Sequence, residues 1–318
     1  MYMKKSRMIR AGTLLLLAAL CFTFIGGQTI QAADTSDKVA ILGSGLNEAE
    51  RTATLEQLKV DSGQDITVDI VNGTDAGRFI DATIADRDMI SSVMVEFKNE
   101  GSGVSSEIVY PENITKIIDY QYSNAAITAG IYDCHITVAA IRPVTGESAL
   151  TGVYKAAEVY GIDLDKDKLV AGNDELITVR VIEDNNANNE DFDSEDFSKA
   201  LTEIKAELAE LVEKEGKDNI TIEQITVIIN NVLNKYEINI SQADIDKLAA
   251  TLEKYKNTLS AEDVKKVLDQ LKTFGEDTWG MAMDFLEGAE DSGWWTNVSS
   301  FFSDLFKAIG DFFSNLFD

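Results

Sequence analysis

The chain has 318 residues, of which 45% are hydrophobic, and its 28 Lys and Arg against 55 Asp and Glu give a net charge of −27. So acidic a chain repels nucleic acid and anionic lipid, which excludes DNA and RNA as partners and favours cations or basic surfaces. The apolar content is high enough for one or two packed cores, which excludes disorder of the whole chain.

Residues 1–33 have the layout of a secretory signal peptide. Basic residues precede position 11, an apolar run covers Leu14 to Ile25, and small residues follow. This pattern predicts cleavage near Ala32 or Ala33 and a secreted protein, extracellular or associated with the cell envelope. The alternative is an uncleaved anchor, which the short apolar run disfavours. Leu20 before Cys21 argues against lipid attachment.

Residues 34–184 predict an α+β domain. A short strand over Val39 to Leu42 and a helix from Asn47 to Leu58, with Asn47 and Glu50 as a capping box, come first. Six elements then follow in the order β-α-β-β-α-β, over residues 65–71, 75–85, 92–97, 104–110, 114–129 and 134–141. With Gly101 to Gly103 as a hairpin turn, this order predicts a split βαβ (ferredoxin-like), mainly antiparallel sheet with helices on one face.

The segment from Ser123 to Gly161 is the least charged long stretch after the signal peptide, so we expect it to form the buried centre. It contains Thr128-Ala129-Gly130-Ile131, Val138-Ala139-Ala140 with Pro143-Val144-x-Gly146, and Ala149-Leu150-Thr151-Gly152-Val153-Tyr154-Lys155-Ala156; Leu42-Gly43-x-x-Leu46 lies near the start of the mature chain. As a set, these motifs resemble DUF1002, a secreted family of Gram-positive bacteria, over most of residues 35–275. The resemblance implies export and supplies no catalytic residues.

Cysteine and histidine are scarce after the signal peptide. Cys134 and His135 are the only ones, so an intramolecular disulfide and a multi-cysteine metal site are excluded. On a strand the two neighbours point to opposite faces, which disfavours a nucleophile and base pair and makes Cys134 a small buried residue. A Ser-His-Asp triad would also need His135, and no G-x-S-x-G turn precedes it.

Two further patterns suggest ligands only weakly. Gly43-Ser44-Gly45 follows a strand, but Glu48 stands where a dinucleotide fingerprint needs its third glycine. Asp163, Asp165, Asp167 and Asp174 have part of the spacing of a calcium loop, although Lys168 replaces its glycine. The alternative for the four aspartates is a solvated turn that leads into a helix from Asp165. We predict no cofactor.

Residues 185–194 are polar, rich in asparagine and predicted to be a linker. Residues 195–274 then predict four amphipathic helices, three of them starting at a capping hydroxyl: Thr221, Ser241 and Ser260. Short connections favour a small bundle, and a repeat surface that holds a peptide is the alternative.

The chain ends with a glycine-containing tether over 275–293 and an amphipathic aromatic helix over 294–318. At 100° per residue its apolar side chains fall on one face, which predicts a partner-binding surface of Trp294, Trp295, Phe301, Phe302, Leu305, Phe306, Ile309, Phe312, Phe313, Leu316 and Phe317. This helix can pack on its own bundle, self-associate or dock a partner protein, or lie in a membrane interface. Lys307, its only cation, disfavours the membrane.

These features predict a secreted protein that is not an enzyme and that associates with a protein or a cell-wall component, or with itself, through the aromatic helix. One alternative is a secreted hydrolase that uses paired carboxylates, which would need two carboxyl groups in a cleft with one kept protonated by burial. The other is a calcium-dependent adhesion or scaffold protein.

Overall fold

The structure, a computed structural model, describes residues 37–61, 63–190 and 192–280, which all belong to one compact unit. Its sheet has five strands: β1 (Lys38–Gly43), β2 (Thr67–Val71), β3 (Ser92–Phe97), β4 (Val104–Ile108) and β5 (Cys134–Ala139). They lie in the order β2-β1-β3-β5-β4. The β1–β2 and β4–β5 pairs are parallel, and the β1–β3 and β3–β5 pairs are antiparallel. The predicted α+β class is confirmed, with a mixed sheet.

The strand order differs from that of a split βαβ unit, because β3 and β4 are not neighbours. β5 lies between them, so the loop over residues 98–103 crosses the start of β5 instead of closing a hairpin. Asp133 holds this loop: its carbonyl accepts from the Lys98 N–H (2.7 Å) and its Oδ1 from the Gly103 N–H (3.0 Å). β5 is almost fully buried and β4 is half-exposed, so the central place suits β5 and the edge suits β4.

The helices of the described chain are α1 (Glu48–Gln57), α2 (Gly73–Ile80), α3 (Asp119–Thr128), α4 (Glu147–Tyr160), α5 (Lys166–Asn186), α6 (Ser194–Glu215), α7 (Ile222–Lys235), α8 (Gln242–Thr258) and α9 (Ala261–Trp279). Short 3₁₀ turns cover Asp86–Asp88, Pro111–Asn113 and Lys217–Asn219. The predicted caps are confirmed: Asn47, Thr221 and Ser260 form capping boxes, and Ser241 accepts from the N–H of Asp244.

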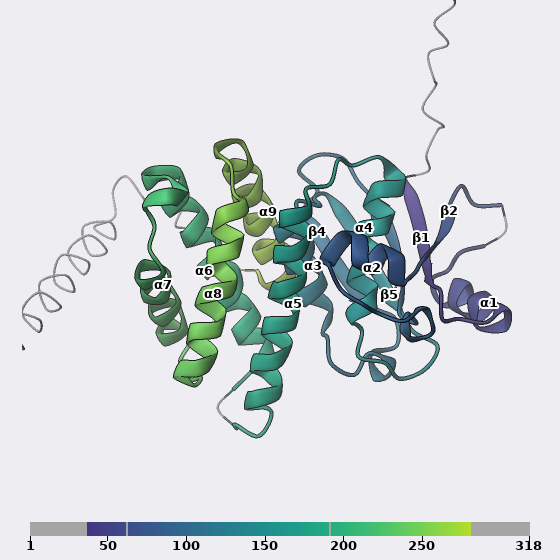
Figure 1. Ribbon diagram of the computed structural model, residues 1–318, viewed down its shortest axis with the longest axis horizontal. Helices are drawn as coiled ribbons and strands as arrows, with labels where there is room; N and C mark the ends of the chain where they lie inside the picture. The colour runs from purple at the N-terminus through teal and green to yellow at the C-terminus, as the bar shows by residue number, and fades with distance from the viewer. Residues whose placement is uncertain (1–36, 62, 191, 281–318) are drawn as a thin grey trace, which may run out of the picture. The chain divides into compact units, whose positions relative to one another are not determined.

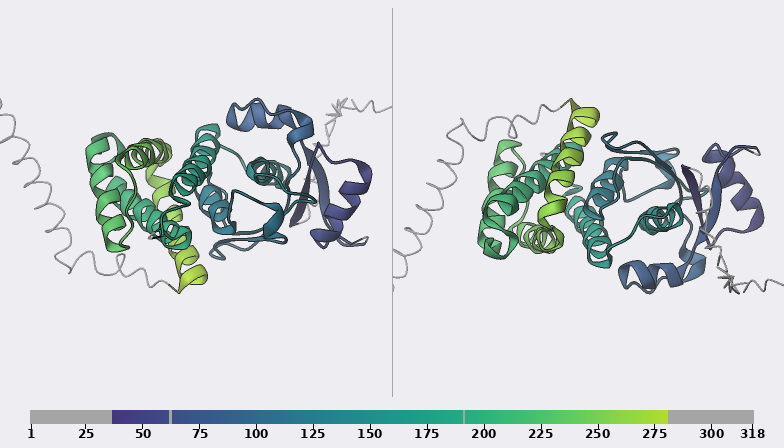
Figure 2. Two further views of the ribbon diagram at one scale, coloured as in Figure 1. Left: turned by 90° about the horizontal axis from the view of Figure 1, so that it is seen from below. Right: turned by 90° about the horizontal axis from the view of Figure 1, so that it is seen from above.

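The two faces of the sheet are covered differently. α3 and α4 pack against the face that carries Ile41 and Val93, and α4 comes so close that a Cβ on Gly152 would lie 3.1 Å from Val93 Cγ2. On the other face, α1 covers one end through a small cluster with Leu42 and Ala139. Figure 2 shows α1 and α4 on opposite sides of β1. Away from α1, residues 37–280 place no helix layer over this second face.

One hydrophobic core extends through both predicted domains. α5 packs against α3 beside the sheet and against α8 on its other side, and α6 packs against α9 and α7 (Figure 1). α5 continues to Asn186, so the predicted linker is the end of this helix and the turn that leads into α6. The asparagine-rich segment therefore joins two long helices around a shared core.

A buried ion pair lies where the sheet-side and bundle-side helices meet. Lys205 Nζ on α6 contacts Glu175 Oε1 on α5 (3.0 Å) and the Asn124 carbonyl on α3 (2.9 Å). The Thr128 hydroxyl donates to Glu175 Oε2 (2.5 Å). Both charged side chains are almost fully buried, at 0% and 3% exposure, so each needs the other and its hydrogen bonds to offset desolvation.

β2 is an edge strand, so one of its sides could pair with a further strand. The Val68 side chain is 46% exposed. The Ile70 N–H donates to the carboxylate of Asp69 (2.8 Å), so this amide is not free to pair with another strand.

Two predicted segments lie outside the described residues: the signal peptide over 1–33 and the aromatic helix over 294–318. α9 continues to Trp279, so the first residues of the predicted tether are helical. None of the helices within residues 37–280 has the length and apolar character needed to cross a membrane.

Lys205→Met is expected to lower the free energy of unfolding by about 3 to 5 kcal/mol, because it leaves the Glu175 carboxylate buried without its cation. The measurement is urea unfolding at neutral pH. Combining Lys205→Met with Glu175→Leu should recover most of the loss, since both buried charges are then gone.

Lys254→Met is the control, because Lys254 is 60% exposed in its pair with Asp174 and its replacement should cost less than about 1 kcal/mol. Equal losses in the two single variants would contradict the assignment.

Candidate functional site

The sheet face without a helix layer carries a row of polar side chains. Lys38 on β1 lies opposite Glu96 on β3, Glu96 opposite His135 on β5, and His135 opposite Ser105 on β4. Residues opposite each other in a sheet share a face, so these four side chains form one line across four strands. Lys38 and Glu96 form an ion pair (3.4 Å).

His135 is the centre of a hydrogen-bonded set. Its Nδ1 lies 2.8 Å from Ser105 Oγ, and its Nε2 lies 3.7 Å from Glu107 Oε1. The Thr137 hydroxyl donates to the same Glu107 oxygen (3.3 Å). The Ser105 hydroxyl can donate to Nδ1 or accept from it, depending on the tautomer of the imidazole.

Ser105 and Glu107 are not among the site residues predicted from the sequence. They lie about 30 positions before His135 and come beside it only because β4 and β5 pair in parallel. The predicted hairpin would have placed β4 next to β3 instead. One sequence signal for this pair is their spacing. Ser105 and Glu107 are two residues apart, so on a strand both side chains lie on the same face.

Cys134 points to the opposite face from His135, as predicted. Its side chain is fully buried in the main core, while the imidazole is 28% exposed. Burial, with a smaller contribution from Asp133, raises the pKa of the thiol to about 12. The thiol is therefore neutral at physiological pH and does not form a nucleophile with His135.

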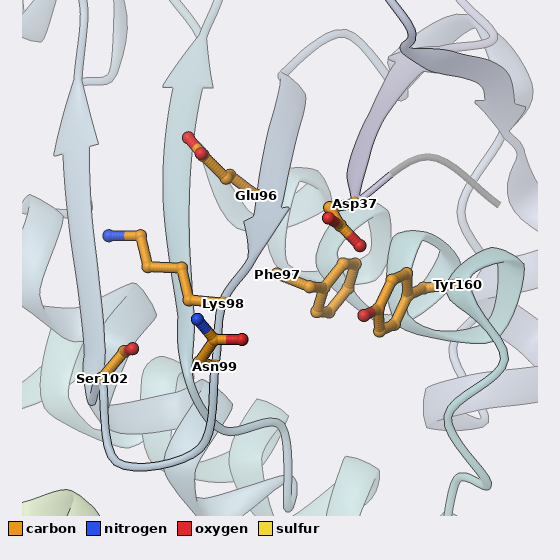
Figure 3. Close-up of a pocket in the computed structure, with 7 residues that line it drawn as sticks. All are labelled: Asp37, Glu96, Phe97, Lys98, Asn99, Ser102 and Tyr160. Carbon is orange, nitrogen blue, oxygen red and sulfur yellow. The ribbon is translucent and has the colours of Figure 1, made fainter.

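A pocket of about 390 Å³ adjoins the polar row at Glu96. Phe97 and Tyr160 stack beside it, with ring centroids 4.0 Å apart and an interplanar angle of 10°. In Figure 3 the two rings lie next to Asp37, while Glu96 and Lys98 point away from them. We call the polar row, Glu107 and this pocket the sheet-face site; the pocket is lined by Asp37, Glu96, Phe97, Lys98, Asn99, Ser102 and Tyr160.

The sheet-face site offers hydrogen-bond donors and acceptors of both charges, and the pocket adds the partly exposed ring of Tyr160. Asp37, Glu96 and Glu107 supply carboxylates, and Lys38 and Lys98 supply ammonium groups. Such a mixture suits the recognition of a polar ligand or of a partner surface that carries both charges.

The turn over Gly43 to Gly45 is structural, in agreement with its sequence. The N–H groups of Ser44 and Gly45 donate to the carbonyls of Val71 and Met89, both at 2.9 Å, so they do not face a phosphate. A Cβ on Gly43 would lie 2.2 Å from the Met89 carbonyl oxygen, which explains the glycine.

The four aspartates considered for calcium do not line a common loop. Asp165 caps α5, where its carboxylate accepts from the N–H groups of Asp167 and Lys168. Asp174 lies seven residues after Asp167 in the same helix, a rise of about 10 Å, and pairs with Lys254 at 2.5 Å. Asp163 is exposed before the helix begins. The helix from Asp165 onward is confirmed. Within residues 37–280, side chains of His, Cys, Asp and Glu form no group of three or more that could hold a metal.

The predicted partner-binding side chains from Trp294 to Phe317 lie outside the described residues. The structure therefore adds the sheet-face site as a second candidate contact region and leaves the aromatic helix as a prediction from sequence.

Comparison with known proteins gives the class of this α+β chain. A family model described as "Protein of unknown function (DUF1002)" matches residues 42–274, and the chain belongs to this family. The matched range begins in β1 and ends within α9, so it includes the sheet and the helices around the shared core.

Among individual proteins, the chain is similar to the "Uncharacterized protein YpuA" of Bacillus subtilis (strain 168). The two are 27% identical over 304 residues, which cover 94% of this chain and 97% of that protein. No solved structure matches the chain.

In the folded chain that starts after the predicted signal peptide and therefore lacks Cys21, the Cys134 thiol should not react with iodoacetamide at pH 8, because it is buried and its pKa is raised to about 12. Labelling should become complete in 8 M urea, as measured by the mass of the intact protein. Fast labelling of the folded protein that is lost in a His135→Gln variant would instead indicate an activated cysteine.

Proposed function

We propose that this chain is an exported, non-enzymatic protein of the cell envelope or extracellular space, which acts by binding a protein or a cell-wall component. The observation that carries this proposal is the sheet-face site. There, the polar row lies on the sheet face that residues 37–280 leave without a helix layer, and the pocket lies at the end of β3, where Phe97 and Tyr160 stack on the α4 side.

The distribution of charge supports binding to another molecule at this face. Some ionised side chains elsewhere are paired within the molecule, as in the network of Arg78 and Lys155 with Asp75 and Glu158. In the pocket, Asp37, Lys98 and Asn99 line the open space instead. Polar groups gathered beside an aromatic pair are typical of a recognition surface.

The sequence of residues 294–318 supports a second contact. Its aromatic and aliphatic side chains repeat at helical spacing, and the chain that precedes them contains Gly280, Gly288 and Gly293. In this proposal the aromatic helix associates with a partner protein, with another copy or with the envelope, while the sheet-face site selects the ligand. The signal-like sequence of residues 1–33 supports export.

Removing the aromatic segment should release the protein from its partner. The full chain and a version ending at Gly293 are expressed in a Gram-positive host, and both are measured in the medium, in the envelope fraction and by size-exclusion chromatography. We expect the full chain in the envelope fraction or in larger assemblies and the shortened chain as a monomer in the medium. Recovery of both in the medium as monomers would contradict the role of the aromatic segment.

The contribution of the sheet-face site is tested separately. Asn99→Arg with Ser102→Arg should fill the pocket and reduce retention on isolated envelopes at least tenfold, since both residues line it and lie in an exposed loop. Asn257→Arg adds the same type of charge at an exposed position at the end of α8 and serves as the control. Unchanged retention of the double variant would show that the pocket does not contact the ligand.

A further inference from the structure

A second pocket, of about 340 Å³, lies away from the sheet-face site. It is formed by the segment that leads into α3, the end of α5 and the start of α6. Ile117, Ile118 and Phe192 supply apolar walls, and Lys116, Glu183 and Asp184 supply charged groups. Its volume is at the lower end of the range for small-molecule sites.

Glu183 is the unusual group in this pocket. Its Oε2 accepts from Gln121 Nε2 (2.6 Å), whereas its Oε1 is buried and has no hydrogen-bond partner among the described residues. Burial raises the pKa of Glu183 to about 7, while the neighbouring Gln121 and Ser194 oppose the rise and the charge of Asp184 adds to it. A buried acceptor without a donor is uncommon in folded proteins.

The charged neighbours of Glu183 are occupied elsewhere. Lys116 pairs with Asp184 (2.6 Å), and Arg180 pairs with Asp184 (3.1 Å) and Glu147 (2.8 Å). On the α3 side, burial raises the pKa of Tyr120, and the charges of Glu183, Asp119, Glu195 and Asp193 raise it further, so the phenol is neutral. Burial also raises the pKa of Asp119. The surroundings of Glu183 are thus acidic, and the cations near it already have partners.

This arrangement disfavours two other uses of the pocket. A carboxylate-dependent hydrolase needs a second carboxylate free to act as base or nucleophile, but Asp184 is held by two cations. A divalent metal needs several oxygen ligands, and the described residues form no such cluster here. A ligand with one positively charged donor group and a small apolar part would fit the groups that line this pocket.

We propose that this pocket binds a primary ammonium group carried on a small apolar body. The ammonium pairs with the Glu183 carboxyl group and favours its ionised form, and the apolar part packs against Ile117, Ile118 and Phe192. The same chemistry is presented by a free amine and by the side chain of a lysine in a peptide. Both are attracted by the net negative charge of the chain.

The test uses the full chain and two probes of similar shape, benzylamine and benzyl alcohol, in titration calorimetry at pH 7. Benzylamine should bind saturably, and benzyl alcohol at least tenfold more weakly. Because the ammonium favours the ionised form of Glu183, binding should release a fraction of a proton per ligand. This release appears as a dependence of the measured heat on the ionisation enthalpy of the buffer. A lysine-containing tripeptide, compared with benzylamine, distinguishes a peptide from a free amine as the source.

Glu183→Gln should weaken benzylamine at least tenfold and abolish the proton release, whereas Glu56→Gln, which removes an exposed carboxylate on α1, should change neither. Equal affinity for the amine and the alcohol in the parent protein, absence of saturation, or unchanged binding by Glu183→Gln would each overturn the proposal. The comparison of amine with alcohol needs no variant, so it holds even if Glu183→Gln fails to fold.

The melting temperature gives an independent check that Glu183 is buried. Its pKa rises from 4.5 to about 7 on folding, so its contribution to stability is full below about pH 4.5 and is lost as the pH rises through about 7. The Glu183→Gln variant has no carboxyl group at this position, so its stability does not fall in this way as the pH rises. The melting temperature of the variant relative to the parent should therefore increase between pH 5 and pH 8, and a constant difference would contradict the burial on which the proposal rests.

Discussion

The contact between Lys205 and Glu175 is the constraint on which the arrangement of the helices depends. Burial raises the pKa of Glu175 and lowers that of Lys205, and each charge opposes the shift of the other. Lys205 also lies over the ring of Tyr255 on α8, 5.5 Å from its centroid. One lysine thereby meets groups from α3, α5 and α8, and a shift of any of these helices would leave a buried charge without its partners.

This constraint determines how the sheet is covered. α3 is held on one side by the polar network around Lys205 and on the other by the sheet, where Ser106 on β4 donates to the Asp119 carbonyl (2.6 Å). The apolar mass of the helices is therefore gathered on a single face of the sheet. The polar row from Lys38 to Ser105 lies on the opposite face, where α1 covers one end of the sheet.

The sequence predicts most elements, because their signals are local. The capping pairs Asn47 with Glu50 and Ser260 with Asp263 involve residues three positions apart, and the structure contains both. Strand order is not local. It depends on which strand is buried enough for the centre of the sheet, and the sequences of β4 and β5 show that difference only when they are compared with each other.

The sites were harder to predict than the elements for the same reason. Ser105 meets His135 only through parallel pairing, and Glu183 becomes unusual only because Gln121 and the segment before α3 enclose it. In sequence, Glu183 is one of many acids and follows the apolar Val181 and Ile182 without any distinguishing pattern. Burial, which changes its chemistry, comes from residues more than 60 positions away.

The carboxylate of Asp69, which accepts the amide proton of Ile70 on the outermost strand, limits how copies of this protein can join. A sheet that ends in an available amide can be extended by a neighbouring molecule into a fibre, whereas one that ends in a negative charge repels the equally acidic strand of the next copy. The addition of a strand from another copy is therefore disfavoured at this point of β2, because the Ile70 amide is already bonded within its own chain.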